Sequence, residues 1–315
     1  MKSASANADR HRRSPQAPVR AVGVRLPSGL GEVQVFQRIA LASLAQWQAN
    51  RAGLVGPQAD VEYVHQARVA LRRLRSAMDL FRDALPKAWR RRWKPFWRAQ
   101  ARCLGVARDW DVLVTEWLPR LSAVVESDQA LLAGLSGAWP GDWAQAQRGL
   151  AHAELLQRVG DPGLDRQLKA FRRSVRRLSP GGTPAPVRPR WVRRRVQRLH
   201  DQGVRASKAV ADADADSRHA LRIHLKRLRY TLDLLAHLLP PKRVRRYQRA
   251  LVDVLDGLGQ LNDLATVRRL LSSAPAQAQP LLDDWLGRQE SALLARLPEV
   301  LQAWQRAPMP CKRRH

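Results

Sequence analysis

An internal repeat constrains this fold more than any other feature of the sequence. When residues 65–113 are aligned without a gap on residues 219–267, an offset of 154 residues, 15 of the 49 positions are identical. A shared basic composition explains some of these matches, but not the pairing of rarer residue types. Those pairs are His65 with His219, Pro86 with Pro240, Gly105 with Gly259, and Asp109 with Asp263. Because self-similarity at a fixed offset marks a repeated structural unit, we expect two similar halves that face each other about a pseudo-twofold axis.

Apolar residues recur through the middle of the chain at i, i+3, i+4 and i+7, with little alternation of period two, and this spacing predicts an all-α fold. Turn-forming residues divide the pattern, and the longest such break has the composition of a linker. We predict five regions: a disordered basic arm over 1–28, an N-terminal helical half over 30–178, a Pro/Gly linker over 179–188, a C-terminal helical half over 189–306, and a basic tail over 307–315. Inside the repeat we expect separate helices over 87–104 and 109–126, and over 242–257 and 262–273.

The charge balance points to an anionic partner. The chain carries 56 Lys and Arg against 27 Asp and Glu, a formal net charge of +29. Such a surplus destabilises a compact chain by self-repulsion unless a polyanion shares its surface. It argues against a cationic substrate and favours nucleic acid, an anionic membrane surface or another polyphosphate. Because 45% of the residues are hydrophobic, the chain can bury a sizeable core, which excludes wholesale disorder.

The cysteines and the apolar segments bear on the cellular compartment. Cys103 and Cys311 lie far apart, so we expect neither a disulfide framework nor a cysteine-based metal site, as in a protein of the reducing cytosol. No stretch approaches 18 consecutive apolar residues, and we expect no insertion into a membrane. The basic residues near the N-terminus are not followed by an apolar stretch, which argues against an export signal. The sequence leaves open whether the protein forms a homodimer.

A line of cations borders the apolar face of the helix around His65. At 100° per residue, with His65 at 0°, Arg68, Arg72 and Arg75 fall between about 280° and 340°, and Asp79 follows at about 320°. Arg73 lies elsewhere, at about 80°. The repeat places the same line on the second helix, with His219, Arg222, Lys226 and Arg229, ending in Asp233.

A line of one charge sign is costly, because cations at i, i+3 and i+4 repel one another. The arrangement makes sense if a chain of anions lies along it. We expect Asp79 and Asp233 to hold the last arginine of each line in a fixed rotamer. The alternative is a solvated basic face paired with acids on a neighbouring helix, and the occurrence of two matched copies argues against it.

These motifs resemble those of a known family. His-x-x-Arg followed by Arg/Lys-Arg-Leu-Arg occurs at residues 65–75 and again at 219–229, and the second copy continues to Tyr230. Residues 104–112 read Leu-Gly-Val-Ala-Arg-Asp-Trp-Asp-Val. This combination resembles the CHAD domain, the conserved histidine α-helical domain, over roughly residues 30–306. The second copy departs from the first in having Asn262-Asp263-Leu264-Ala265 where residues 108–111 read Arg-Asp-Trp-Asp, so we expect a less polar corner there.

The resemblance implies two antiparallel, four-helix-bundle-like halves around a central basic channel. It also implies binding of inorganic polyphosphate, often at polyphosphate granules, which would place the protein in the cytoplasm. From the residues themselves we expect no catalysis and neither a cofactor nor a metal. The predicted polyphosphate-binding residues are His65, Arg68, Arg72, Arg73, Arg75, Arg108, Arg194, Arg198, His219, Arg222, Lys226, Arg227 and Arg229. The residues predicted to orient them or to serve the structure are Asp79, Asp109, Asp111, Asp233, Asp263 and Tyr230.

Two other functions remain as alternatives. Phosphoryl transfer through a phosphohistidine needs a metal or a phosphate-cradling loop, and the sequence contains neither a P-loop nor a His-Glu-x-x-His motif. Asp109 and Asp111 diverge by about 200° on a helix, so we expect Asp109 to pair with an arginine of the histidine-motif helix or to cap a helix. Nonspecific nucleic-acid binding is favoured by charge, but the tryptophans at 89, 93 and 97 have the spacing of a packed face, which predicts core rather than a base-stacking surface.

Overall fold

The computed structural model describes residues 17–24, 26–27, 29–55, 60–126, 140–179, 186–208, 210, 214–274 and 276–310. The regular structure of these residues is helical, which confirms the predicted all-α fold. In chain order the helices are α1 (Glu32–Leu54), α2 (Val61–Leu80), α3 (Lys87–Val112), the π-helix η1 (Leu113–Trp117), α4 (Leu118–Glu126), α6 (Gly141–Gly160), α7 (Pro162–Arg176), α8 (Pro189–Lys208), α9 (Ala215–Leu235), the 3-10 turn η2 (Ala236–Leu238), α10 (Pro241–Leu271), the 3-10 turn η3 (Ala276–Ala278) and α11 (Gln279–Arg306).

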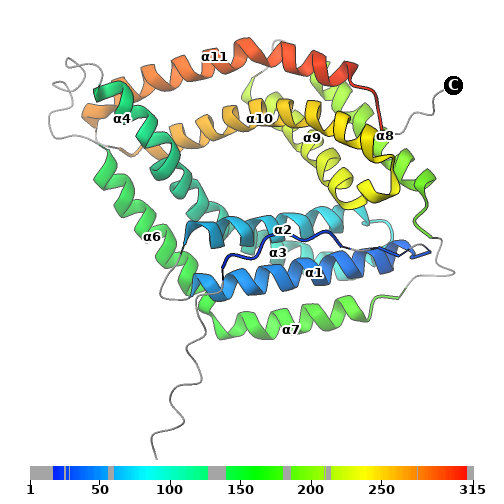
Figure 1. Ribbon diagram of the computed structural model, residues 1–315. Coiled ribbons are helices and arrows are strands. Elements are labelled where there is room, and N and C mark those ends of the chain that lie inside the picture. The colour runs from blue at the N-terminus through cyan, green and yellow to red at the C-terminus, as the bar shows by residue number, and fades with distance from the viewer. Residues whose placement is uncertain are drawn as a thin grey trace, which may run out of the picture.

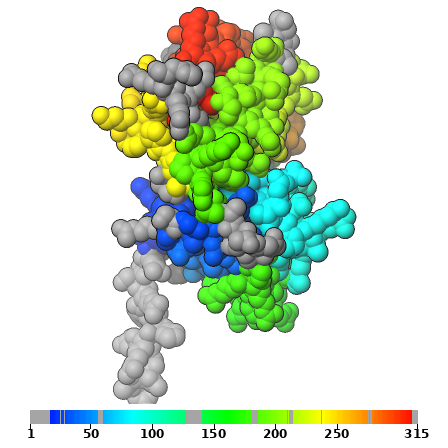
Figure 2. All heavy atoms as spheres, turned by 90° about the vertical axis from the view of Figure 1, so that its right-hand side faces the viewer, coloured from blue at the N-terminus to red at the C-terminus, as the bar shows by residue number. Residues whose placement is uncertain are grey.

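The helices are arranged as the four sides of a frame (Figure 1). Helices α1, α2, α3 and α7 form one long side, and α10 and α11 form the opposite one. Helices α4 and α6 lie at one end of the frame, and α8 and α9 lie at the other. Figure 2 looks onto the α8 end and shows side chains from this part of the chain spanning the two long sides.

The offset of 154 residues relates helices as well as individual residues. Helices α2 and α9 begin at residues 61 and 215, and α3 and α10 begin at residues 87 and 241. The packing order also corresponds, since α1 contacts α2 and α2 contacts α3, while α8 contacts α9 and α9 contacts α10. The pseudo-twofold axis between these units stays a prediction.

The breaks that we predicted after residues 104 and 257 are wrong. Helix α3 continues through Gly105 to Val112, and α10 continues through Gly257 and Gly259 to Leu271. An interior glycine costs a helix about 1 kcal/mol relative to alanine, but each of these glycines is followed by buried apolar residues that hold the helix in place. The irregularity comes later in the chain, at the π-helix that joins α3 to α4.

The hydrophobic core crosses the predicted boundary between the halves. The larger core joins Trp97 and Phe171, which precede the linker, to Tyr247 and Trp304, which follow it. A smaller core packs residues of η1 and α4 against residues of α10 and α11, with Trp117 and Trp285 in edge contact. The halves therefore interlock, because neither encloses a separate core.

The segment that precedes α1 is docked on the helices. Val19 accepts hydrogen bonds from Asn50 Nδ2 at 2.9 Å and Gln46 Nε2 at 3.3 Å, and its own amide donates to Asn50 Oδ1 at 3.0 Å. Arg73 Nη1 donates to the carbonyl of Val22 at 2.7 Å. The predicted disordered arm over 1–28 therefore does not include residues 17–24, whereas residues 1–16 lie outside the described part.

Parts of the predicted linker and of the predicted tail also pack on the helices. Of the predicted linker, residues 180–185 lie outside the described residues, while Val187 donates its amide to the carbonyl of Leu30 at 2.8 Å. Of the predicted basic tail, residues 311–315 lie outside them, and Met309 is buried. Within the described ranges, no helix has both the length and the apolarity needed to cross a bilayer.

Candidate functional site

The two predicted lines of cations converge where α2 packs against α9. Arg68 and Arg72 project from α2, and Arg222 and Lys226 project from α9. Burial together with the nearby charges of Arg222, Arg72 and Arg68 lowers the pKa of the Lys226 ammonium to about 7. The guanidinium of Arg72 also lies over the ring of Tyr230 on α9, 5.3 Å from its centroid. Side chains from both halves of the chain therefore form one cationic cluster, which we call the α2–α9 cluster and define by Arg68, Arg72, Arg222 and Lys226.

Two aspartates on α3 and α10 support this cluster from matching positions. Arg68 Nη1 lies 3.7 Å from Asp109 Oδ1, and Arg222 Nη2 lies 4.0 Å from Asp263 Oδ1. The members of the second pair are each 154 residues after those of the first. Asp109 Oδ2 also lies 3.7 Å from Arg269 Nη2, which ties α3 to α10. The predicted pairing of Asp109 with an arginine of the histidine-motif helix is confirmed, and the predicted helix start at this residue is wrong.

Gly105 leaves space for the Arg68 side chain. A Cβ at this position would lie 3.1 Å from Arg68 Nη1, closer than ordinary van der Waals contact. At the equivalent Gly259 a Cβ would meet nothing within 4 Å. The two glycines occupy matching places in the sequence, but only the first admits a guanidinium against the helix surface.

The α2–α9 cluster remains accessible to solvent. The Arg68 side chain is 40% exposed, whereas that of Arg222 is 16% exposed. The Nε of Arg222 is buried and has no hydrogen-bond partner in the described part of the chain. Four cations thus face two supporting aspartates, and a buried N–H donor is left unused. This is an arrangement that an anion can stabilise.

The two motif histidines have different surroundings. His65 is half-buried, and burial together with Arg108, Arg72 and Arg68 lowers its pKa, although Glu62 opposes this effect. His219 is exposed, and its Nδ1 lies 3.2 Å from Asn262 Oδ1. Asn262 stands 154 residues after Arg108, so one histidine lies near a guanidinium and the other beside an amide.

The acids at the ends of the two lines are held differently from each other. Asp233 lies 3.9 Å from Arg229 Nε and accepts a hydrogen bond from Gln248 at 3.0 Å. This is the contact that we predicted for the last arginine of a line. Asp79 instead pairs with Lys94 Nζ at 2.7 Å. It still acts on its own line, because its charge opposes the effect of burial that lowers the pKa of Arg75.

Several residues predicted for the site make their contacts outside the four residues of the α2–α9 cluster, although Arg73 lines a cavity together with Arg72 and Tyr230. Arg73 is turned to the N-terminal segment, and Arg108 pairs with Glu116 at 3.1 Å. Arg227 lies near His224, where it helps to lower the pKa of that imidazole after burial. The two arginines predicted on α8, Arg194 and Arg198, are exposed.

Asp111 has a structural role. It is fully buried and accepts hydrogen bonds from Arg148 Nε and from the His152 ring, each at 2.8 Å. Burial alone raises the pKa of this carboxyl, but the hydrogen bonds and charges of His152 and Arg148 outweigh it and lower the pKa. Asp111 thereby joins α3 to α6, on a different side of α3 from Asp109. Sequence reasoning missed Arg148, His152 and Arg269, which no local motif marks.

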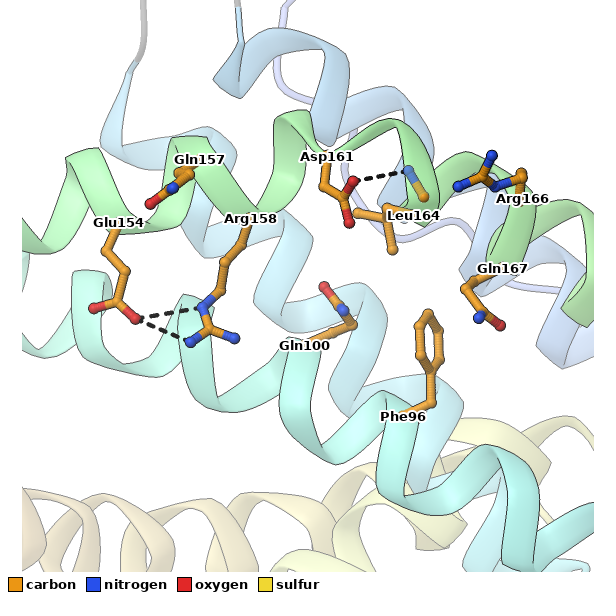
Figure 3. A pocket seen from close by; sticks show the side chains of 10 residues that line it. Phe96, Gln100, Glu154, Gln157, Arg158, Asp161, Leu164, Arg166 and Gln167 are labelled. Atoms are coloured by element: carbon orange, nitrogen blue, oxygen red, sulfur yellow. Dashed lines mark hydrogen bonds and ion pairs between the residues drawn. The ribbon is translucent and has the colours of Figure 1, made fainter.

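Other features of the molecule do not converge on the α2–α9 cluster. Within the described ranges, no group of three or more His, Cys, Asp or Glu side chains is placed to hold a metal ion. A cavity of about 590 Å³ lies between α3 and the corner of α6 and α7 (Figure 3). There Arg158 is turned onto Glu154, and Asp161 accepts a hydrogen bond from the Gly163 amide at 2.8 Å, so both acids of the cavity wall already have partners, whereas Arg166 is exposed.

The fold and the cluster define a class of all-helical proteins in which two His-Arg helices bring their cations together. Residues 38–272 match the family model of the CHAD domain, and the chain belongs to the CHAD family. The recognition made from the motifs is thereby confirmed.

Two solved structures are similar to this chain. The crystal structure of the CHAD domain from the plant Ricinus communis superposes with a TM-score of 0.67 at 29% identity, covering 95% of this chain and 99% of that one. PptA from Streptomyces chartreusis superposes with a TM-score of 0.55 at 18% identity, covering 88% and 99%. At that identity the second match supports the fold alone. A comparison with curated protein sequences gave no significant match.

Proposed function

We propose that this protein binds inorganic polyphosphate without catalysis, and that the α2–α9 cluster is the centre of its binding site. The observation that carries the proposal is the convergence of Arg68 and Arg72 with Arg222 and Lys226. These four cations are partly buried, and only some of their positive charge is paired with aspartates. Membership of the CHAD family supports the same ligand, because the family is associated with polyphosphate.

The chemistry of the ligand suits this cluster. Polyphosphate presents about one negative charge per phosphoryl unit along a flexible chain, with repeated tetrahedral oxygens and no bases. Guanidinium groups recognise such oxygens in pairs, and charges held in a concave, partly desolvated place act more strongly than charges on a flat surface. We infer that the ligand runs along a central channel between the long sides of the frame.

Nucleic acid fits the described surface less well. Of the three tryptophans that the spacing predicted to be core, Trp93 and Trp97 are buried at 2% and 0% exposure, and Trp89 is partly buried against the core; no tryptophan in the described part of the chain is exposed. A platform on which bases stack is therefore missing from those residues. We expect long-chain polyphosphate to displace DNA from the protein at equal phosphate concentration, and DNA to fail to displace polyphosphate.

The supporting acids favour binding over catalysis. Asp109 is engaged by Arg68 and Arg269, whereas Asp111 is engaged by Arg148 and His152. The two carboxylates therefore do not converge on one place where they could share a metal ion or a reacting phosphoryl group. CHAD domains are generally non-catalytic binding domains, which is consistent with this geometry.

The binding experiment compares a quadruple variant with a matched control. In Arg68→Ala/Arg72→Ala/Arg222→Ala/Lys226→Ala we expect polyphosphate affinity, measured by calorimetry, to fall by at least a hundredfold. The control removes four exposed cations elsewhere, in Arg166→Ala/Lys169→Ala/Arg296→Ala/Arg306→Ala, and is expected to lose less than tenfold. Circular dichroism checks that both variants are folded. Equal losses in the two variants would mean that net charge, and not the α2–α9 cluster, binds the anion.

We further propose that the protein resides in the cytoplasm at polyphosphate granules. The test is to image the fluorescently tagged chain beside a polyphosphate stain. We expect the tagged protein to coincide with the granules and the quadruple variant to be diffuse. A quadruple variant that still marks the granules would show that recruitment there is indirect.

A further inference from the structure

Lys226 differs from the other cations of the α2–α9 cluster because it carries a primary amine. The other three are guanidinium groups, which keep their protons in proteins. A lysine becomes a nucleophile once its ammonium group loses a proton, and it does so more readily when it is desolvated or lies beside another cation. In the internal repeat the position of Lys226 is taken by Arg72, so the amine occurs on the α9 side of the cluster alone.

The surroundings of Lys226 favour the neutral form of the amine. Lys226 is partly buried on α9, where Arg222 precedes it by one turn, and Arg68 and Arg72 of α2 lie close enough to act on its charge. The acid that opposes these cations is Asp263 of α10, whose carboxylate lies 4.0 Å from Arg222. Lys226 itself forms no ion pair with any acid in the part of the chain that the structure describes.

These surroundings make Lys226 reactive at neutral pH. Burial and the three neighbouring cations lower the pKa of its ammonium group to about 7. About half of the Lys226 side chains are therefore free amine at pH 7, whereas a lysine with an ordinary pKa of about 10.4 is free amine in less than about 0.1% of molecules. A nucleophile is thus available at a pH at which other lysines are almost fully protonated.

The guanidinium groups of the cluster are suited to hold a small anion beside this amine. The Arg68 side chain is 40% exposed, which gives an anion access from solvent. The Nε of Arg222 is buried and lacks a hydrogen-bond partner among the described residues, which leaves an N–H donor one turn away from Lys226. Guanidinium donors bind phosphoryl oxygens well. A molecule bound by its phosphoryl group therefore has its neighbouring atoms close to the amine.

We propose that Lys226 is an acylation site for acyl phosphates, the mixed anhydrides of a carboxylic acid and phosphoric acid. The guanidinium groups hold the phosphoryl group while the neutral Nζ attacks the carbonyl carbon. An amide bond forms, and the bond from the carbonyl carbon to the bridging oxygen breaks. Inorganic phosphate leaves with the electron pair, and a proton passes from Nζ to solvent. Because an acyl phosphate brings a single phosphoryl group, three guanidinium groups can balance its charge without protonation of the amine.

Acylation removes the positive charge of Lys226 and thereby changes the cluster. The consequence for polyphosphate rests on the proposed function, because a cluster of three cations binds the polymer more weakly than a cluster of four. A supply of acyl phosphate therefore releases bound polyphosphate. Bound polyphosphate in turn covers the amine and protects it from acylation.

The first experiment measures acetylation of the full chain by acetyl phosphate at pH 7, with each lysine quantified by mass spectrometry. We expect the initial rate at Lys226 to exceed that at Lys169, an exposed lysine of α7, by about tenfold, because Lys226 has the larger fraction of free amine. The rate at Lys226 should level off above about pH 8, whereas the rate at Lys169 should continue to rise. Equal rates at the two lysines would overturn the inference.

An uncharged reagent separates anion binding from the reactivity of the amine. The N-hydroxysuccinimide ester of acetic acid acetylates free amines but has no phosphoryl group. The rate at Lys226 relative to the rate at Lys169 should be severalfold larger with acetyl phosphate than with this ester. An equal ratio for the two reagents would show that the guanidinium groups do not hold the phosphoryl group, and it would overturn the assignment of acyl phosphates.

The last experiment measures tripolyphosphate binding by calorimetry before and after treatment with acetyl phosphate. We expect affinity to fall severalfold as Lys226 becomes acetylated, whereas Lys226→Arg should keep the affinity that it had before treatment. If Lys226 reacts preferentially but the untreated protein binds no tripolyphosphate, the proposed function fails and the acylation site stands. If the untreated protein binds tripolyphosphate but Lys226 reacts no faster than Lys169, the acylation site fails and the proposed function stands.

Discussion

Lys226 provides a pH test of the cluster, because it is the only lysine among four cations. Its counterpart 154 residues earlier is Arg72, which cannot lose its proton in this range. With a pKa of about 7, the free Lys226 side chain is about 90% protonated at pH 6 and about 10% protonated at pH 8. The negative charge of a bound polyanion raises the pKa of the ammonium group, so binding takes up a proton.

The size of the effect follows from this difference. Because the anion binds the form in which Lys226 is charged, the apparent affinity is proportional to the fraction of protein in which Lys226 is protonated. Between pH 6 and pH 8 the protonated fraction, and with it the affinity, falls about tenfold, which is equivalent to about 1.4 kcal/mol of binding free energy. Replacement by arginine keeps the charge and removes the titration.

Calorimetric titration with inorganic tripolyphosphate at pH 6 and pH 8 measures this effect. We expect Lys226→Arg to bind like the unmodified protein at pH 6 and about tenfold more tightly than it at pH 8. The control is Lys169→Arg, the same change at an exposed position on α7, which should leave the pH dependence intact. The reasoning is refuted if the unmodified protein binds equally at both pH values, or if Lys226→Arg retains the full dependence.

Three further predictions concern neighbouring residues. His65→Gln should reduce the fall in affinity that remains as the pH rises towards about 6.5. The pKa of His65 is lowered in the free protein, so in this pH range binding makes the imidazole take up a proton. An unchanged pH profile in the same titration would exclude a role for His65 protonation in binding. Gly105→Ala should weaken tripolyphosphate binding severalfold, because the added methyl group displaces Arg68. Gly259→Ala should leave binding unchanged and raise the free energy of unfolding, measured in urea, by up to about 1 kcal/mol. Equal affinity of the two variants for tripolyphosphate would contradict the role given to Gly105. Asp111→Asn should lower the free energy of unfolding by about 3 kcal/mol, because it breaks the buried contacts with Arg148 and His152 on α6. The affinity of the folded protein for tripolyphosphate should not change. A stable variant with weakened binding would instead place Asp111 in the binding site.

Local patterns in the sequence predicted much of the fold and the centre of the site. Apolar spacing predicted the helices, and the repeat placed Arg68 and Asp109 at positions that match Arg222 and Asp263. The same offset recurs in the structure, in helix starts and in ion pairs. These features depend on residues close together in one helix or on identity between two helices, which a sequence displays directly.

Other features, which depend on how distant elements meet, were not predicted. Gly105 suggests a helix end by its propensity, but the packing of buried neighbours keeps α3 continuous through it. Arg269 contacts Asp109 because α10 passes α3. Asp79 pairs with Lys94, and not with the predicted Arg75, because the start of α3 lies beside the end of α2. The interlocked core has the same origin, since it joins side chains more than a hundred residues apart.

The central claim is that α2 and α9 together form one anion site. Calorimetry with tripolyphosphate on Arg72→Ala, Lys226→Ala and the double variant tests it most directly. We predict one bound anion per chain in the unmodified protein, a loss of affinity in each single variant, and a double variant whose loss differs from the sum of the two by about 1 kcal/mol. Two bound anions per chain, with each single variant abolishing one and sparing the other, would contradict the account.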